Sequence, residues 1–249
     1  MLSLNKRFLP MKITAAVVVS ILFFTGTIHA QTFVVFKGDT INRKDAKGLK
    51  QGIWKKFYRT DSLFSITSFK DNKQTGTTKF YYESGKLKST LIWKKPGQLA
   101  FAESFFEEGK KMSDGYYLNE QKDSTWHYYN EEGKITSQET YRKGVKQGKW
   151  LTYYPEGGKV EEKNYMSGKL EGPYLKFFKD GKLMLKATYK NDKLTGGYTI
   201  YNADGGFYTT GQYNAGDRAG KWTVFNEKGK PWIESQYKNG FEVKTDTLQ

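Results

Sequence analysis

The chain has 249 residues, of which 41 are Lys or Arg, 26 are Asp or Glu and none is Cys, giving a formal net charge of +15. The absence of cysteine excludes disulfide bonds, and the two histidines leave too few ligands for a zinc site of the usual Cys/His kind. The positive charge favours anionic partners in a general way and says nothing about the fold.

Residues 1–30 have the composition of a secretory signal peptide. Lys6, Arg7 and Lys12 precede an apolar stretch over residues 13–24, and the small residue Ala30 closes the segment. We expect cleavage near Ala30 and export to the periplasm, outer envelope or extracellular space. The competing interpretation is an uncleaved anchor, but an apolar stretch of about 12 residues is shorter than the roughly 20 that span a bilayer.

Residues 31–47 precede the first full unit of a repeat. Residues 32–36 read as a strand and residues 37–39 as a turn, which predicts an N-terminal capping hairpin that covers the first edge of the array. Residues 241–249 follow the last unit and are expected to form a C-terminal tail.

A 24-residue unit recurs eight times between these ends without insertion or deletion. Positions in the unit are counted from 0, which falls at Gly52, Gly76, Ala100, Ser124, Gly148, Gly172, Gly196 and Gly220. Positions 5 and 17 are aromatic in every unit, and position 2 is Trp or Tyr in six of them. We assign a structural role to the aromatics at positions 2 and 5, among them Trp54, Phe57, Tyr81, Phe105, Trp126, Tyr129, Trp150, Tyr153, Tyr174, Phe177, Tyr201, Trp222 and Phe225.

Each unit reads as two strands and two turns. Positions 7–10 carry turn residues, with Gly at position 9 in seven units, and positions 18–23 are expected to form a second, longer turn. This spacing predicts that position 5 faces position 12, and that position 17 lies opposite position 2 of the next unit. The predicted aromatic neighbours are Tyr141 and Trp150, Tyr165 and Tyr174, Tyr189 and Tyr198, and Tyr213 and Trp222.

The predicted fold is therefore all-β, an elongated single-layer antiparallel meander of about eight stacked β-hairpins over residues 48–240, forming an open twisted trough. No window has the apolar spacing and caps of a helix.

The recurring pattern G-x-W-x-x-Y-Y-x-x-G-K, followed by Y-x-x-G-K-x-x-G, resembles the MORN repeat, and most of all its bacterial variant, which is sometimes labelled an antitoxin family. The resemblance covers residues 48–240 and is weakest in the units that start at Ala100 and Ser124. It implies an elongated sheet of hairpins and a role in binding or scaffolding rather than catalysis, with membranes or proteins as partners.

Catalytic candidates find little support in the sequence. His127 occupies position 3, where other units carry Lys, Glu, Leu or Thr, so we expect a surface-facing side chain outside any triad. The acidic pairs 107–108 and 131–132 lie beside exposed turns, and residues 161–162 lie on a strand whose neighbouring side chains point to opposite faces. We predict no enzymatic activity, no cofactor and no metal.

Departures from the repeat are the better candidates for partner binding. They are the unusual tryptophans Trp93 and Trp232 and the added aromatic pair Phe207 and Tyr208. A second set consists of lysines at position 10, namely Lys86, Lys110, Lys134, Lys182 and Lys230. These lysines either solvate the turns and discourage edge aggregation, or form a basic margin for an anionic lipid or glycan.

We expect a non-enzymatic protein-interaction module or scaffold at the bacterial envelope. The first alternative is a peripheral binder of anionic lipid or polysaccharide that uses the basic margins and exposed rings. The second is an antitoxin-like inhibitor of a protein partner, and nucleic acid is the least favoured partner because an exported protein seldom meets it.

Overall fold

The computed structural model describes residues 31–248, so the predicted signal peptide and its cleavage site near Ala30 lie outside the described residues. The described chain contains strands, turns and bends and no helix. The described residues divide into two compact units, residues 31–100 (unit 1) and residues 101–248 (unit 2), and strand β7 (Leu99–Phe105) crosses the division. Over residues 31–248 there is no helix of the length and apolar character needed to cross a membrane.

Unit 1 is an antiparallel meander in which each strand pairs with its neighbour in the chain. Its strands are β1 (Thr32–Phe36), β2 (Asp39–Lys44), β3 (Lys50–Phe57), β4 (Leu63–Lys70), β5 (Lys73–Tyr81) and β6 (Leu87–Lys95). The segment predicted as the capping hairpin contains β1 and β2, which pair with each other, and β2 also pairs with β3 of the first repeat.

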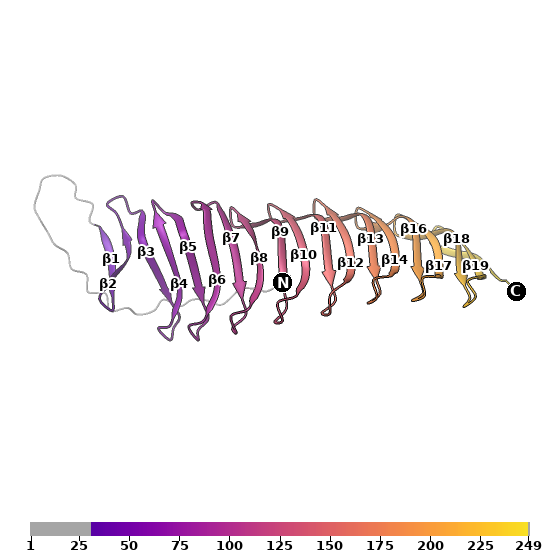
Figure 1. The fold of residues 1–249 in the computed structure, drawn as a ribbon. Coiled ribbons are helices and arrows are strands. Elements are labelled where there is room, and N and C mark those ends of the chain that lie inside the picture. Colours follow the sequence, from indigo (N-terminus) through magenta and orange to yellow (C-terminus); the bar gives the residue numbers. More distant parts are fainter. Residues whose placement is uncertain (1–30, 249) are drawn as a thin grey trace, which may run out of the picture. The chain divides into compact units, whose positions relative to one another are not determined.

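Unit 2 continues the same pattern, with hairpins that follow one another in chain order (Figure 1). Its strands are β8 (Lys111–Leu118), β9 (Gln121–Tyr129), β10 (Ile135–Arg142), β11 (Val145–Tyr153), β12 (Lys159–Met166), β13 (Lys169–Phe177), β14 (Leu183–Lys190), β15 (Lys193–Leu194), β16 (Gly196–Tyr201), β17 (Phe207–Asn214), β18 (Asp217–Phe225), β19 (Pro231–Lys238) and β20 (Phe241–Thr247). The all-β meander of antiparallel hairpins is thereby confirmed, and no pairing in the described part closes either unit into a barrel. The predicted C-terminal tail is wrong for residues 241–247, which form β20 and pair with β19.

The first turn of each unit is a tight loop closed by backbone hydrogen bonds. In the unit that starts at Gly148, the Tyr154 amide donates to the Gly158 carbonyl at 3.1 Å, and the Gly157 amide donates to the Tyr154 carbonyl at 2.9 Å. Beyond this turn Tyr153 pairs with Lys159, so position 5 faces position 11. The predicted partner, position 12, is wrong because a β-bulge shifts the register by one residue there.

The second turn is shorter than the sequence suggested. Met166 pairs with Lys169, which leaves only Ser167 and Gly168 in the loop, with φ angles of 51° and 85°. Two successive residues with positive φ match the two-residue hairpin turn whose twist suits the flanking strands. The predicted longer turn over positions 18–23 is therefore wrong: strand pairing resumes at position 21.

The two faces of the sheet bury few side chains completely. The buried hydrophobic residues of the described chain are Ile41, Ala100, Ala102, Trp126, Trp150, Ala187 and Trp222. Three of them are tryptophans at position 2, while the aromatics at position 5 stay half-exposed. In place of a compact core, ring contacts between neighbouring strands stabilise the sheet.

Candidate interaction surfaces

One face of unit 2 carries rows of aromatic rings from positions 2 and 17, and we call it the tryptophan face. The ring of Trp150 lies 5.2 Å from that of Tyr141 and 5.0 Å from that of Tyr165. Tyr213 and Trp222 are 5.2 Å apart at an interplanar angle of 87°. The predicted neighbours Tyr141–Trp150 and Tyr213–Trp222 are confirmed, and such pairs add about 0.5–1.5 kcal/mol each beyond their buried area.

The tyrosines at position 2 make their ring contacts differently. Tyr174 lies 5.4 Å from Tyr189, and Tyr198 lies 5.2 Å from Tyr213, and each pair lies within a single 24-residue repeat. Position 17 pairs across the ladder with position 0 of the same unit, as Tyr189 does with Gly172. This register brings a position 17 ring close to position 2 of its own unit, a contact that the sequence analysis did not predict.

Each tryptophan at position 2 in unit 2 is tied to the preceding hairpin by its indole nitrogen. The donors and carbonyl acceptors are Trp126 and Tyr116 at 3.0 Å, Trp150 and Thr140 at 2.9 Å, and Trp222 and Gln212 at 3.2 Å. The acceptor is position 16 of the previous unit in all three cases. These bonds fix the orientation of the three rings and satisfy their buried N–H groups.

A cation lies over every tryptophan at position 2 of the repeat, in unit 1 as well as in unit 2. The cation belongs to the residue four positions earlier, and it also lies over the ring at position 17. The ammonium or guanidinium groups lie 4.7 Å (Lys50 over Trp54), 4.6 Å (Lys122 over Trp126), 4.6 Å (Lys146 over Trp150) and 4.4 Å (Arg218 over Trp222) from the ring centres. At this distance the ring quadrupole attracts the charge.

The sequence contains a signal for this arrangement in the residue four positions before position 2. Where position 2 is Tyr, as in Tyr174 and Tyr198, the residue four positions earlier is Leu. Where position 2 is Thr78 or Ala102, that residue is Gln. The four repeats with Trp at position 2 thus all have a cation four residues earlier, and the four repeats without Trp have none. This correlation indicates that the pair acts as one structural element.

Charged and phenolic groups surround one of these pairs. Glu139 accepts a hydrogen bond from the Tyr141 hydroxyl at 2.7 Å, and the Lys122 ammonium donates to the Tyr128 hydroxyl. Burial lowers the pKa of Lys122, and the charge of Glu139 opposes that shift. Burial, with the nearby Glu139 carboxylate, raises the pKa of both Tyr128 and Tyr141, so their hydroxyls stay protonated at neutral pH.

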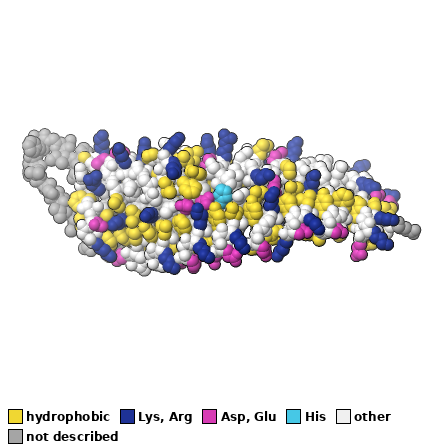
Figure 2. All heavy atoms as spheres, in the orientation of Figure 1, with side chains coloured by type: hydrophobic (Ala, Val, Ile, Leu, Met, Phe, Trp, Pro, Cys, Tyr) yellow, Lys and Arg dark blue, Asp and Glu magenta, His cyan; other side chains and the backbone are white. Residues whose placement is uncertain are grey.

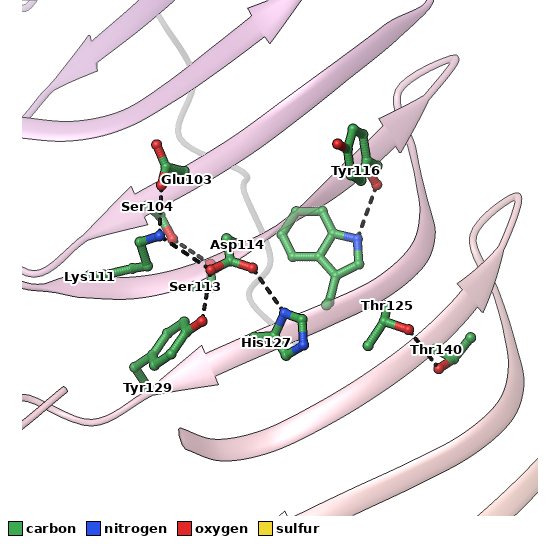
Figure 3. A network of polar contacts seen from close by, with 11 residues as sticks. Glu103, Ser104, Lys111, Ser113, Asp114, Tyr116, Thr125, His127, Tyr129 and Thr140 are labelled. Atoms are coloured by element: carbon green, nitrogen blue, oxygen red, sulfur yellow. Dashed lines mark hydrogen bonds and ion pairs between the residues drawn. The ribbon is translucent and has the colours of Figure 1, made fainter. Parts of the chain in front are cut away.

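The opposite face of unit 2 carries a polar cluster centred on Asp114 (Figure 3). One Asp114 oxygen lies 3.0 Å from Nδ1 of His127, and the other accepts the Tyr129 hydroxyl at 2.8 Å. The Lys111 ammonium lies 3.4 Å from Asp114 and 2.7 Å from Glu103. His127 is therefore on a strand face as expected, but it is engaged by a carboxylate that the repeat pattern did not predict.

The electrostatics of the cluster stabilise charged Asp114. Burial alone would raise the pKa of this carboxyl group, but hydrogen bonds from His127, Tyr129 and Lys111 outweigh burial and lower it. The hydrogen bond to Glu103 raises the pKa of Lys111. All three polar neighbours of Asp114 stabilise its charged form. In the described chain no hydroxyl nucleophile is hydrogen-bonded to His127. A structural role accounts for the cluster.

Adjacent acids at 161–162 point to opposite faces, as predicted. Glu161 accepts hydrogen bonds from Lys163 at 2.8 Å and from the Tyr174 hydroxyl at 2.6 Å on the tryptophan face. Glu162 lies 2.5 Å from the ammonium group of Lys149 on the other face. Two carboxylates separated by the sheet cannot flank one glycosidic bond. Across residues 31–248 no group of three or more metal-ligating side chains is arranged around a common point.

The four aromatic residues predicted to bind a partner lie in different surroundings. Trp93 is half-buried at position 17, and its indole nitrogen donates to the Thr78 hydroxyl at 3.0 Å. Phe207 stacks between Tyr201 and Phe225, at 5.6 and 5.5 Å.

Tyr208 and Trp232, 51% and 48% exposed, line one groove in unit 2. Their role in binding stays a prediction.

The predicted lysines of position 10 do not form a uniform basic margin. Lys134 lies 3.0 Å from Glu132, and Lys182 lies 3.4 Å from Asp180, so both are neutralised by acids of their own turn. On the visible face in Figure 2, Lys and Arg side chains are interspersed with Asp and Glu side chains in each unit. Lys86, Lys110 and Lys230 remain candidates for binding an anionic group.

Fold and surfaces together define a class: an all-β repeat protein built from hairpins that share aromatic rows. Residues 74–95, 170–191 and 218–239 match the MORN repeat variant. All three matches start at position 22 and end at position 19, in phase with the 24-residue unit. The chain therefore contains MORN repeats, as its sequence pattern indicated.

Comparison with curated proteins finds no match. Among solved structures, S. aureus TarM in complex with fondaparinux, alpha-GlcNAc-glycerol and UDP is 11% identical with a TM-score of 0.24, over 48% of this chain and 19% of that one. The TcdB2-TccC3-TEV structure is 9% identical with a TM-score of 0.24, over 87% of this chain and 15% of that one. The Photorhabdus luminescens Tc holotoxin pore is 10% identical with a TM-score of 0.23, again over 87% and 15%. This chain therefore spans less than a fifth of these structures, and the likenesses are too weak to carry an argument.

Proposed function

We propose that this protein is a non-enzymatic module that binds a protein partner at the bacterial envelope. MORN repeats are generally protein or lipid interaction modules. The observation that carries the proposal is the tryptophan face of unit 2, where half-exposed Tyr rings and Lys and Arg side chains are held in fixed orientations over buried tryptophans. Aromatic residues and Arg are enriched in protein interfaces, and side chains that are already ordered lose little entropy on binding.

A protein partner fits the charges better than a lipid surface does. A membrane attracts clusters of unpaired Lys and Arg. Here Lys134, Lys163 and Lys182 are paired with carboxylates, and acidic side chains are interspersed among basic ones (Figure 2). The net charge of +15, with Lys86, Lys110 and Lys230, supports the second candidate, a peripheral binder of anionic lipid or polysaccharide. An antitoxin-like inhibitor would be one kind of protein-binding module.

Export rests on the composition of residues 1–30, with the positive start, apolar stretch and small final residue of a signal peptide. A mature chain without cysteine needs no oxidising compartment for stability. The envelope is then where we expect the partner.

Site-directed photo-crosslinking in cells tests the proposal. A photoreactive amino acid replaces Lys176, which lies 5.9 Å over the Tyr174 ring, and in a control replaces Glu156 on an exposed turn. We expect a discrete protein adduct from position 176 and none from position 156. In parallel, the chain is floated with vesicles containing phosphatidylglycerol at low and physiological salt. Salt-sensitive flotation without a protein adduct would contradict the proposal and support the lipid alternative.

A further inference from the structure

A groove of about 510 Å³ lies between two consecutive turns of unit 2. Its walls and floor are formed by Asn202, Asp204, Tyr208, Val224, Phe225, Asn226, Glu227 and Trp232. The first three belong to the turn after β16 and to β17, and the others to the end of β18, the turn after it and β19 in the next repeat. Two adjacent repeats thus build the groove, and each contributes the residues at its positions 6 and 12.

The two exposed rings of the groove occupy the same position of the repeat. Tyr208 and Trp232 are both at position 12, the bulged position, and are about half exposed. The other units carry Phe64, Lys88, Met112, Thr136, Val160 and Met184 there. Phe64 packs 5.2 Å from Tyr58. Consecutive units with aromatic rings at the bulge therefore occur only at this end of the array.

The spacing of these rings follows from the fold. Tyr208 lies on β17 and Trp232 on β19, with β18 between them. Two strand spacings separate equivalent positions by roughly 9–10 Å. Phe225 and Phe207 stack at 5.5 Å beside them and keep this part of the sheet rigid. The result is a pair of aromatic platforms at a fixed separation along the sheet.

The polar groups of the groove are mostly hydrogen-bond acceptors. One Asp204 oxygen accepts the Gly206 amide at 2.8 Å, and the Asn226 oxygen accepts the amides of Lys228 and Lys230, both at 3.0 Å. In the described chain the second Asp204 oxygen, the Glu227 carboxylate and the Asn226 amide group keep hydrogen-bonding capacity for a ligand.

We propose that this groove binds a neutral oligosaccharide. The C–H faces of sugar rings are apolar and flat, so they stack on Tyr208 and Trp232, while ring hydroxyls donate to Asp204 and Glu227. The two carboxylates repel anionic glycans and phosphate headgroups in spite of the net positive charge of the chain. The site is separate from the tryptophan face and does not depend on the proposed protein partner.

A proline-rich peptide is the main competing occupant, because such peptides also dock on aromatic-lined grooves. A proline-rich backbone presents carbonyl acceptors and few N–H donors. The free carboxylate oxygens of Asp204 and Glu227 need donors, which hydroxyl-rich sugars supply and proline-rich segments lack. The Tyr208 hydroxyl and the Asn226 amide group can bond to sugar hydroxyls as well. The observations therefore favour the saccharide.

Titration calorimetry with the full chain tests the proposal, with cellohexaose, chitohexaose and maltohexaose as probes. We expect at least one hexaose to bind saturably with little dependence on salt. Trp232→Ala and Tyr208→Ala should each weaken binding about tenfold or more, because each removes one stacking platform. Phe241→Ala is the matched control, since Phe241 is a 77% exposed ring outside the groove, and it should leave binding unchanged.

A measurement on the unmodified groove guards against misfolded variants. The indole N–H signal of Trp232, assigned with Trp232→Phe, should shift on addition of the bound hexaose while the other tryptophan signals stay in place. The proposal is overturned if no hexaose binds, if neither ring variant weakens binding, or if a proline-rich decapeptide shifts the Trp232 signal and the hexaoses do not.

Discussion

A β-carbon placed on Gly115 would lie 2.3 Å from the indole of Trp126, so the ring of one repeat lies directly on the backbone of the preceding repeat. The same relationship holds between Gly211 and Trp222, at 2.1 Å. Both glycines occupy position 15, and both indoles donate to the carbonyl of the residue after the glycine. Close approach of ring to backbone is the physical link between successive hairpins at these two places.

We predict that Gly115→Ala destabilises the protein by about 1–3 kcal/mol, because the methyl group would force the buried indole out of position. Gly197→Ala is the matched control, since a β-carbon there meets no atom within 4 Å and the backbone φ is not positive. Urea unfolding followed by tryptophan fluorescence measures both. Equal midpoints for the two variants would show that the ring is not held against the glycine.

Removing a cation from the tryptophan face gives the second prediction. The Lys146 ammonium lies 4.6 Å over Trp150 and 4.9 Å over Tyr165. Lys146→Met keeps the length of the side chain, and we expect a loss of about 0.5–1 kcal/mol from the cation–π contacts at this exposed position. Lys169→Met changes an exposed lysine after the next two-residue turn, where the described chain shows no ring contact, and should have little effect on urea unfolding. A similar loss in both variants would mean that net charge, and not the ring contact, is responsible.

The repeat period was sufficient to predict the strands, because aromatic residues at fixed positions mark the same sheet position in every unit. The strand register could not be predicted from the repeat period alone. The bulge at position 12 has no fixed residue type, as Lys88, Val160 and Trp232 show, so its position could not be read from the sequence. The two-residue turn did have a signal in Asn239-Gly240, a pair typical of positive φ at both positions.

The candidate surfaces were predictable only where they break the repeat. Tyr208 and Trp232 stand out as added aromatics, and the structure places both in one groove. The contact between Asp114 and His127 was not predictable, because it joins two positions that vary between units and depends on the register of β8 against β9. Pairwise contacts across strands follow from the register, and the bulges that set the register have no signal in the repeat pattern.

Processing of the N-terminus gives the third prediction. If residues 1–30 are a cleaved signal, the chain recovered from the envelope should begin at Gln31. Ala30→Arg should block cleavage and leave a larger, membrane-associated form, whereas the conservative Thr25→Ser should be processed normally. Intact mass and N-terminal sequencing of the fractionated protein measure this. An unprocessed wild-type chain in the membrane fraction would favour the uncleaved anchor.

The fourth prediction concerns pH and the polar cluster of Figure 3. Asp114 has a lowered pKa in the folded state, so the unfolded chain binds its proton more readily and folding favours the charged form. The resulting stability is fully present above the ordinary Asp pKa of about 4 and is lost as pH falls through the lower pKa of the folded state. We therefore expect Asp114→Asn to lose about 1–2 kcal/mol at pH 7, where His127, Tyr129 and Lys111 lose their charged acceptor.

The difference in unfolding free energy between wild type and Asp114→Asn should narrow as the pH falls below about 4 and through the lower pKa of folded Asp114, because the wild-type carboxyl group then takes up a proton. Asp217→Asn, at an exposed position in β18, should follow the wild-type curve over the whole range. Urea unfolding at a series of pH values gives the three curves. A constant gap between wild type and Asp114→Asn at every pH would show that the side chain acts through its shape and hydrogen bonds alone, and not through its charge.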